Sequence, residues 1–305
     1  MPAAKNVVTN ALLTMVNQGL QTAFNKGMQV VPNFAEKLNL LTVNSTTAEE
    51  LYGWIKDLPE LEKNPDTITW NPVEMLGQSI VNDEFKTGIV IPRKAIEDDQ
   101  YGMFGNLASK LGQNGALTPD YELLNLLPLL FTTKLAYTGV TFFNTAHNLG
   151  VTQFSNKMTN KLSAANYATA RAMLKAMKRA NGEVMFTLLD PGKSFLIVGE
   201  NWQVTAEYIV QVQHLAGGGD NPNFNTAQVV VIPGLGDAWM LWDCADLVTP
   251  VVYQKRIPLE LTAALDLASP NVLNDDDFKW KARMRFAFGP GEPRRAVGSD
   301  GTTGP

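Results

Sequence analysis

The stretch Tyr52-Gly53-Trp54-Ile55-Lys56-Asp57-Leu58-Pro59-Glu60-Leu61-Glu62 combines large apolar side chains with a glycine and a proline. Glycine and proline both disfavour a long helix, so we expect an extended loop here. A long loop has little core of its own in which its aromatic side chains could be buried. The pattern therefore indicates assembly against another protein surface rather than chemistry.

The composition of the chain agrees with this interpretation. The 305 residues have a formal net charge of -5 and are 45% hydrophobic, an ordinary value for a globular protein of about two domains. Only 18% of the residues are charged, against about 25% in typical soluble domains. This low fraction suggests that much of the surface lies against other protein. The acidic balance lacks the basic excess of a nucleic-acid binder, and no apolar stretch is long enough to predict a membrane span.

Helical periodicity predicts an amphipathic helix over 10–26 that stops at Gly27. Thr118 and Pro119 suggest the start of another helix, separated from the preceding one at Asn114-Gly115. The predicted helices comprise residues 10–26, 97–113, 119–131, 163–180 and 201–214. For the helix at 163–180, Ser163 is the expected N-cap and Gly182 the expected residue after the C-cap.

Strand signals are segregated from these helices along the chain, which predicts the α+β class. Residues 51–93 contain four prolines and read as one long hairpin with edge strands. Further strands are predicted at 195–198, 228–232, 238–243, 250–256 and 280–286. The Gly-rich tail from Gly298 to Pro305 is expected to be disordered.

Candidate catalytic and ligand-binding motifs are weak. The single cysteine, Cys244, excludes an intrachain disulfide and a cysteine-based metal cluster, and its apolar neighbours favour an inert, buried thiol. Gly192-Lys193-Ser194 resembles the end of a phosphate-binding loop, but Thr187 stands where that motif needs glycine. We therefore expect no catalytic residue, no cofactor and no metal site. A hydrolase that uses Cys244 with His147 or His214 stays open as an alternative.

Several collinear stretches resemble the major head subunit family of Mu-like phages over roughly residues 8–297. They are Tyr52-Gly53-Trp54 through Pro59, 96–102, Phe142-Phe143 with His147, 239–243 and 250–256. The resemblance implies the Hong Kong 97-type capsid fold. In that fold, residues 1–50 would be an N-terminal arm, 51–93 an extended β-hairpin loop, 94–160 with 272–298 a peripheral domain with a spine helix, 161–271 an axial domain and 299–305 a flexible tail.

The implied function is that of a structural protein, the major capsid subunit of a tailed double-stranded DNA phage or prophage. Copies would form hexamers and pentamers of an icosahedral shell that is assembled in the host cytoplasm and encloses DNA without sequence-specific or membrane binding. Portal, decoration, and separate scaffold and protease proteins are the expected partners, since no charged scaffolding segment precedes residue 1. The alternative outside enzymes is a tail-tube or other virion protein. The residues expected to contact neighbouring subunits are Trp54, Leu58, Pro59, Trp70, Leu12 and Phe24.

Overall fold

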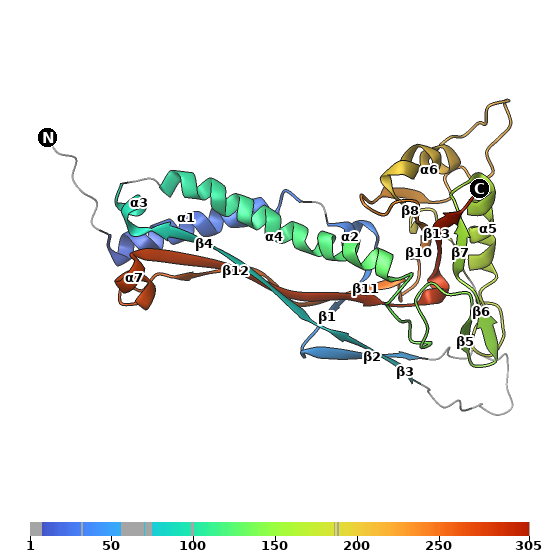
Figure 1. Ribbon diagram of the computed structural model, residues 1–305, viewed down its shortest axis with the longest axis horizontal. Helices are drawn as coiled ribbons and strands as arrows, with labels where there is room; N and C mark the ends of the chain where they lie inside the picture. The colour runs from blue at the N-terminus through green and yellow to red at the C-terminus, as the bar shows by residue number, and fades with distance from the viewer. Residues whose placement is uncertain are drawn as a thin grey trace. The chain divides into compact units, whose positions relative to one another are not determined.

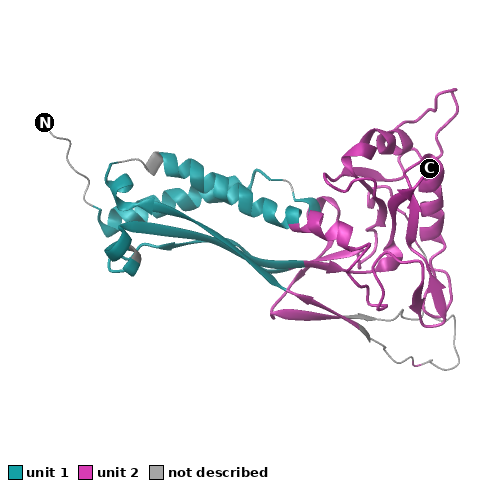
Figure 2. Ribbon diagram, viewed as in Figure 1, with its two compact units in different colours: residues 1–34, 82–121, 255–287 teal, residues 35–81, 122–254, 288–305 magenta. Residues whose placement is uncertain are grey.

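The computed structural model describes residues 8–31, 33–55, 70, 75–98, 101–185, 187 and 189–304. The chain divides into two compact units (Figure 2). Unit 1 comprises residues 1–34, 82–121 and 255–287, and unit 2 comprises residues 35–81, 122–254 and 288–305. The chain is shown with its helices and strands labelled in Figure 1.

Unit 1 combines helices with strands β11, β12 and β4, which are neighbours in that order in one sheet. Its described elements are α1 (Asn10–Met28), β4 (Asp83–Pro92), α3 (Arg93–Glu97), most of α4 (Tyr101–Leu129), most of β11 (Val251–Ala264), α7 (Pro270–Asp275) and most of β12 (Asp277–Pro290). Strands β12 and β4 pair antiparallel from Asp277 opposite Pro92 to Phe286 opposite Asp83. Trp280 of β12 is buried and donates from Nε1 to Asn17 Oδ1 of α1 at 3.0 Å. This bond joins the helix to the inner face of the sheet.

Helix α1 begins at the predicted place, because the Thr9 side chain caps it by accepting a hydrogen bond from the Leu12 N–H. The predicted stop at Gly27 is wrong, since the helix continues to Met28. Gly27 has another role: a Cβ there would lie 1.9 Å from the carbonyl oxygen of Ser109 in α4. The missing side chain permits close contact between the two helices.

Helix α4 is one continuous helix, so the predicted break at Asn114-Gly115 is wrong. A Cβ at Gly115 would lie 2.6 Å from Cδ2 of Leu259 in β11, so this glycine makes room for a neighbouring side chain. Thr118 is not an N-cap, because its hydroxyl donates to the Asn114 carbonyl at 3.1 Å inside the helix. The helix ends at Leu129, directly after Pro128.

The predicted hairpin over 51–93 is shorter than expected. Strand β2 (Glu49–Ile55) pairs antiparallel with β3 (Met75–Val81) as a two-stranded sheet. The following strand, β4, pairs with β12 in the sheet of unit 1. Residues 83–92 are therefore a strand, but one that pairs outside the predicted hairpin.

Unit 2 is built on a five-stranded sheet of order β7-β13-β10-β8-β9. Its strands are β7 (Lys157–Asn160), β8 (Ser194–Val198), β9 (Gln228–Val231), β10 (Trp239–Asp243) and β13 (Ala296–Thr303). Helices α5 (Ala164–Lys175) and α6 (Gln203–Val210) share one apolar core with Leu196, Trp239 and Leu241 of this sheet. The remaining elements of unit 2 are α2 (Phe34–Lys37), β1 (Leu41–Asn44), β5 (His147–Leu149), β6 (Thr152–Phe154), η1 (Glu200–Trp202) and η2 (Pro293–Arg295).

Two predicted helices of unit 2 end earlier than expected. Ser163 is the N-cap of α5, as predicted, and accepts from the Asn166 N–H at 3.2 Å. The helix stops at Lys175, so Gly182 is not its C-terminal glycine. Gly182 instead has φ +91° in the turn that links Lys178 to Val184. Helix α6 ends at Val210 rather than at His214.

The prediction of a flexible tail at 299–305 is wrong for residues 299–303, which belong to β13. Ser299 is fully buried and its hydroxyl donates to the Asn160 carbonyl at 2.5 Å. The glycines have structural roles: a Cβ at Gly298 would lie 2.8 Å from the Phe143 ring, and Gly301 has φ +66°. The polar, Gly-rich composition reflects close packing rather than disorder.

Candidate assembly site

The β2–β3 hairpin, which contains Tyr52, exposes several large apolar side chains. Leu51 of β2 is 74% exposed and Val81 of β3 is 59% exposed. Trp70, in the connection between the strands, is 86% exposed. A two-stranded sheet is marginally stable alone in water, so this hairpin needs an anchor within the chain and gains from a partner surface.

The anchor is a buried glutamine of β11, Gln254. The Tyr52 hydroxyl of β2 donates to Gln254 Oε1 at 2.7 Å, and Gln254 Nε2 donates to the Ile80 carbonyl of β3 at 3.2 Å. On β3, Gln78 Nε2 donates to the Leu135 carbonyl at 3.0 Å. Burial, followed by the charge of Glu50, raises the pKa of Tyr52 to about 12. The phenol therefore stays protonated and able to donate at neutral pH.

An apolar contact adds to these hydrogen bonds at the same end of the hairpin. Ile80 is 5% exposed, and a Cβ placed on Gly289 would lie 2.4 Å from its Cδ1 atom. The absence of a side chain at Gly289 thus leaves room for Ile80 beside the end of β12. Both strands of the hairpin are held at this end, through Tyr52 and Ile80.

The turn that leads into β2 is fixed by one carboxylate. Glu50 accepts hydrogen bonds from the N–H groups of Thr46 and Thr47 and from the Ser45 hydroxyl, at 2.8 to 3.1 Å. These bonds, those from the Thr46 and Thr47 backbone first, lower the pKa of Glu50 to about 2. The carboxylate is therefore charged at neutral pH, and the start of the hairpin is set locally.

The residues predicted to contact neighbouring subunits fall into different environments. Trp54 lies in β2, where it pairs with Leu76; its side chain, with all of Leu58 and Pro59, lies outside what the structure describes. Trp70 is exposed, and Leu12 is half-buried against the core of unit 1. Phe24 is only 1% exposed. It belongs to the inward stripe of α1, so its assignment as a contact residue is wrong.

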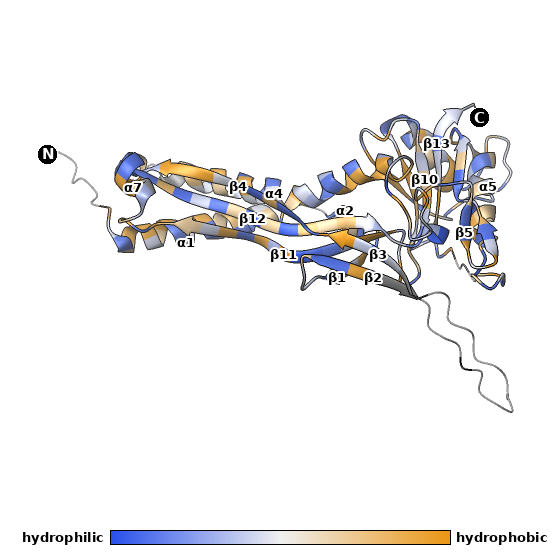
Figure 3. Ribbon diagram, turned by 60° about the horizontal axis from the view of Figure 1, so that its bottom comes forward, coloured by the Kyte–Doolittle hydropathy of each residue, from blue (hydrophilic) through white to orange (hydrophobic). Residues whose placement is uncertain are grey.

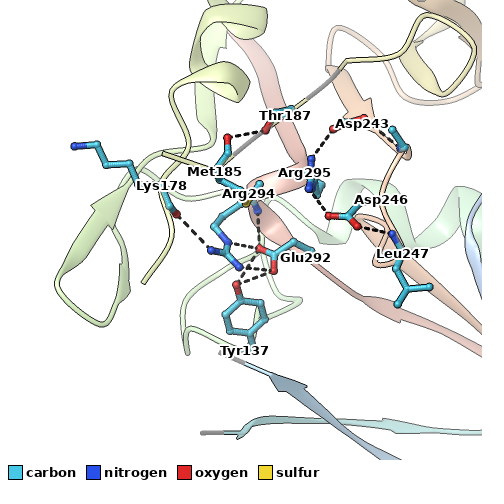
Figure 4. A network of polar contacts seen from close by, with 11 residues as sticks. Tyr137, Lys178, Met185, Thr187, Asp243, Asp246, Leu247, Glu292, Arg294 and Arg295 are labelled. Carbon is cyan, nitrogen blue, oxygen red and sulfur yellow. Dashed lines mark hydrogen bonds and ion pairs between the residues drawn. The ribbon is translucent and has the colours of Figure 1, made fainter. Parts of the chain in front are cut away.

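A second polar network fixes the chain where β12 leads into β13 (Figure 4). The Glu292 carboxylate accepts from Arg294 Nε at 2.8 Å and from the Tyr137 hydroxyl at 2.9 Å. Beside it, Arg295 Nη1 donates to Asp243 Oδ2 of β10 at 2.8 Å, and its Nη2 pairs with Asp246. The Asp243 side chain is fully buried and that of Arg295 is 8% exposed. The network holds the start of β13 against β10.

His147, which is fully buried, is the centre of a third polar group. Its Nε2 donates to Asn156 Oδ1 at 3.1 Å, because that oxygen can only accept, and its Nδ1 accepts from the Thr138 hydroxyl at 2.7 Å. Asn156 Nδ2 donates to the carbonyls of Phe142 and Pro293. Desolvation lowers the pKa of His147, which makes it a neutral structural residue.

The residues of the enzyme alternative do not form a catalytic arrangement. Both ring nitrogens of His147 bind other partners, and His214 is exposed beside Asp220. Cys244 is buried, and burial, with the Asp243 charge second, raises the pKa of its thiol. Gly192 and Lys193 form a turn, and Ser194 begins β8. Within the described ranges, no cluster of His, Cys, Asp and Glu could hold a metal ion.

Sequence reasoning found the hairpin but missed the residues that anchor it, Gln78, Ile80 and Gln254. The available signal was that Tyr52 and Gln254 lie in two of the stretches that carry the family resemblance. The structure joins these stretches by a hydrogen bond across 202 residues.

Over the described residues, no helix is both long and apolar enough to span a membrane.

The profile of the family described as Mu-like prophage major head subunit gpT matches residues 13–160, 148–235 and 233–303. The major capsid protein of Escherichia phage Mu is 24% identical over 295 residues, covering 97% of this chain and 75% of that protein. The Mu-like prophage FluMu major head subunit of Haemophilus influenzae is 30% identical over 159 residues, which are 52% of this chain and 50% of that protein.

Solved capsids have the same fold. A chain of the bacteriophage JBD30 procapsid matches with a TM-score of 0.60 at 21% identity, over 96% of this chain and 76% of that chain. A virus-like particle from Pyrococcus furiosus matches with a TM-score of 0.53 at 13% identity, over 92% and 98% of the two chains. These likenesses confirm the predicted α+β capsid fold of the Hong Kong 97 type.

Proposed function

Because this chain belongs to the Mu-like prophage major head subunit gpT family and is a phage major capsid protein, we propose that its copies form hexamers and pentamers of an icosahedral shell through the β2–β3 hairpin. The virion capsid is thus its place of function, and assembly in the host cytoplasm is part of the proposal. The similarity to capsid proteins favours a shell over tube formation, the alternative for a virion protein.

The exposed apolar surface of the hairpin is the observation that carries this proposal. Leu51, Trp70 and Val81 are each more than half exposed, while Tyr52 and Ile80 hold the hairpin at one end. An anchored hairpin with an exposed tryptophan in its connection is suited to a protein interface, because few aromatic anchors provide most of the binding free energy. We therefore assign Trp70 as an intersubunit contact, with Trp54, Leu58, Pro59 and Leu12 as further candidates.

The regions implied by the resemblance become proposed roles in the shell. Residues 1–50 would be the arm that reaches a neighbour, and the hairpin that starts at β2 would be the extended loop. Residues 94–160 with 272–298 would form the peripheral domain, with α4 as its spine helix. Residues 161–271 would form the axial domain around each capsomer, but the compact units divide the chain differently, since residues 255–271 belong to unit 1 and residues 122–160 and 288–298 to unit 2. In all these regions, function consists of contact between copies.

The proposed partners are other virion and assembly proteins. A portal, a scaffold, a protease and possibly a decoration protein would act with the shell, and DNA would be enclosed without sequence-specific contacts. We also propose that the chain catalyses no reaction. The buried Cys244 supports this, since a nucleophilic thiol must reach its substrate as a thiolate. Thiol-reactive reagents are expected to label native Cys244 far more slowly than the unfolded chain.

Assembly of the purified chain tests the proposal by sedimentation and negative-stain microscopy. We expect closed shells or ring-shaped capsomers, and tubes would favour the alternative. Trp70→Ala should fold normally but need about thirtyfold more protein to assemble, as for the loss of an interface anchor of about 2 kcal/mol. The control is Leu247→Ala, which alters a residue that is 80% exposed outside the hairpin. Unchanged assembly of the Trp70 variant would reject the role of the hairpin.

A further inference from the structure

Strand β12 carries a regular row of positive charges on the outer face of the unit 1 sheet. Its sequence alternates buried residues with basic ones, and Figure 3 shows the hydrophilic bands that recur along it. The buried partners include Phe278 and Trp280, which lie in the core with α1. The basic residues point to the opposite face because side chains alternate along a strand. They are Lys279, Lys281, Arg283 and Arg285.

The neighbouring strands extend this row into a patch. On β4, Lys86 lies opposite Arg283 and Glu84 lies opposite Arg285. On β11, strand alternation places Arg256 and Glu260 on the same face. We define the basic face as Glu84, Lys86, Arg256, Glu260, Asp277, Lys279, Lys281, Arg283 and Arg285. It has six basic and three acidic residues, an excess of three positive charges.

Some of these cations are already paired within the chain. Arg283 Nε binds Glu84 Oε1 at 2.6 Å, and Lys86 lies 3.8 Å from the same carboxylate. Lys279 lies 3.8 Å from Asp275. The hydrogen bond from Arg283, then the charges of Arg283, Lys86 and Arg285, hold the pKa of Glu84 below its usual value. The positive charges of Arg283, Lys86 and Arg285 therefore all act on the Glu84 carboxylate.

Other cations on the face have unused donors. Arg285 Nε and Arg256 Nη1 are buried atoms without a hydrogen-bond partner among the described residues. Lys281 is exposed, and no ion pair joins it to another described residue. Buried guanidinium N–H groups nearly always find an acceptor, and a carboxylate matches their geometry. Because the two guanidinium atoms are buried, the exposed Lys281 is the cation that this face offers directly to an anionic partner.

We propose that the basic face docks against an acidic surface of a second copy of this chain, an inference that rests on the proposed assembly into shells. The rest of the chain supplies the complementary charge. Of its 25 basic and 30 acidic residues, 19 basic and 27 acidic ones lie outside the basic face. That remainder has a formal excess of eight negative charges. A contact between two different surfaces of identical copies, repeated by rotation, closes into rings.

Nucleic acid is the competing partner, and the charge pattern favours it less. A protein that binds DNA through phosphates neutralises many of them with free cations. Here three of the six basic residues already bind carboxylates of the same chain. Interleaved charges of both signs suit a protein interface, where they select the partner and fix its register.

Charge reversal tests the proposal in the full chain. In Lys281→Glu/Arg285→Glu, the protein concentration for half-maximal assembly should rise about tenfold or more, because like charges would then meet across the interface. Light scattering and negative-stain microscopy report assembly. The control Lys175→Glu/Lys193→Glu makes the same net charge change at two exposed residues of unit 2. It should assemble like the unmodified chain. An equal loss in both double variants would attribute the effect to net charge and overturn the proposal.

Salt provides a second, independent measurement. Raising the ionic strength from about 0.1 M to about 1 M shortens the Debye length from about 10 Å to about 3 Å. Assembly of the unmodified chain should weaken accordingly, and the charge-reversed chain should respond less. If the double variant fails to fold by circular dichroism, Lys281→Gln alone should still raise the required concentration and flatten the salt response. An unaltered salt response in that variant would refute the proposal.

Two outcomes separate the possible failures. If the unmodified chain never forms capsomers or shells, the proposed function fails and this inference falls with it. If the unmodified and charge-reversed chains form the same shells at the same concentration, only this inference fails. Fluorescence anisotropy with a labelled DNA duplex covers the competing partner. Binding that is lost in the double variant while assembly is unchanged would identify the face as a nucleic-acid surface and overturn the proposal.

Discussion

The hydroxyl of Tyr52 in β2 donates a 2.7 Å hydrogen bond to Oε1 of Gln254 in β11, a residue 202 positions later in the chain. Gln254 is fully buried, and its other amide atom donates to Ile80 in β3. One side chain thus links both strands of the hairpin to the body of unit 2. The direction in which the hairpin presents its apolar residues depends on this buried amide.

Removal of the Tyr52 hydroxyl should weaken this anchor. In Tyr52→Phe, Gln254 Oε1 would lose a hydrogen bond in a buried position, which costs about 1–3 kcal/mol. We expect the free energy of unfolding of the unassembled chain to fall by that amount in urea titrations. Hydrogen exchange at the β2 amides should accelerate by a corresponding factor.

Tyr121→Phe is the control, since Tyr121 is 58% exposed and a surface change of this kind stays within about 0.5 kcal/mol. Equal stabilities of Tyr52→Phe and the control would mean that the hydrogen bond to Gln254 contributes nothing to the anchor.

The crossing of α1 and α4 should be intolerant of even one methyl group. A Cβ at Gly112 would lie 2.2 Å from the carbonyl oxygen of Phe24, a backbone atom that cannot rotate away. Gly112→Ala should therefore force the helices apart and destabilise unit 1 by about 1–3 kcal/mol. Thermal unfolding followed by circular dichroism measures the loss.

Gly105→Ala provides a matched control in the same helix, because a Cβ at Gly105 has no heavy atom within 4 Å. Alanine favours a helix over glycine by about 1 kcal/mol, so this variant should be as stable as the unmodified chain or more so. Destabilisation of similar size in both variants would contradict close packing at Gly112 as the cause.

These glycines explain where sequence reasoning about the fold failed. Local patterns predicted α1, α5 and most strands, since each depends on periodicity and caps along a short stretch. Gly27 and Gly115 were interpreted as helix breakers because glycine has low helix propensity. The contacts that select glycine at these positions come from Ser109 and Leu259, which are distant in the sequence. The same holds for Gly298 in β13, where the room left by glycine admits an aromatic ring.

The candidate site was predictable only in part for a similar reason. The apolar, Pro-containing stretch after Tyr52 identified the hairpin, and the exposed Trp70 was among the residues named. The exclusion of Phe24 depends on which side of α1 meets the sheet. The role of Gln254 depends on a pairing between distant strands. The burial of Phe24 follows the helical spacing of Val16 and Leu20. The role of Gln254 leaves no local pattern in the sequence, although collinear resemblance to a family brought both Tyr52 and Gln254 into view.

The buried ion pair between Arg295 and Asp243 should be costly to break from one side. Their side chains are 8% and 0% exposed, so Arg295→Met would leave the Asp243 carboxylate buried without its partner. We expect a loss of about 3–5 kcal/mol in the free energy of unfolding. The double variant Asp243→Leu/Arg295→Met should recover part of that loss, because it removes the unpaired charge. A double variant less stable than Arg295→Met would contradict this account.

Acid should destabilise unit 2 through His147. Burial lowers the pKa of this residue, while the bonds to Asn156 and Phe142 and the nearby charge of Glu292 oppose the shift without reversing it. The unfolded chain binds a proton at this residue near pH 6.5, whereas the folded chain does so only at a lower pH. The stability contribution is therefore fully present above about pH 6.5 and is lost as the pH falls toward the pKa of the folded state. Melting temperatures between about pH 8 and pH 5 should show this decline.

The variant His147→Gln should show a smaller decline with falling pH. It should also be less stable at every pH, because it loses the stacking of His147 on Phe154, at 4.6 Å between ring centroids. His214→Gln is the control, because His214 is exposed. An equal decline in both variants would show that His147 is not the responsible group.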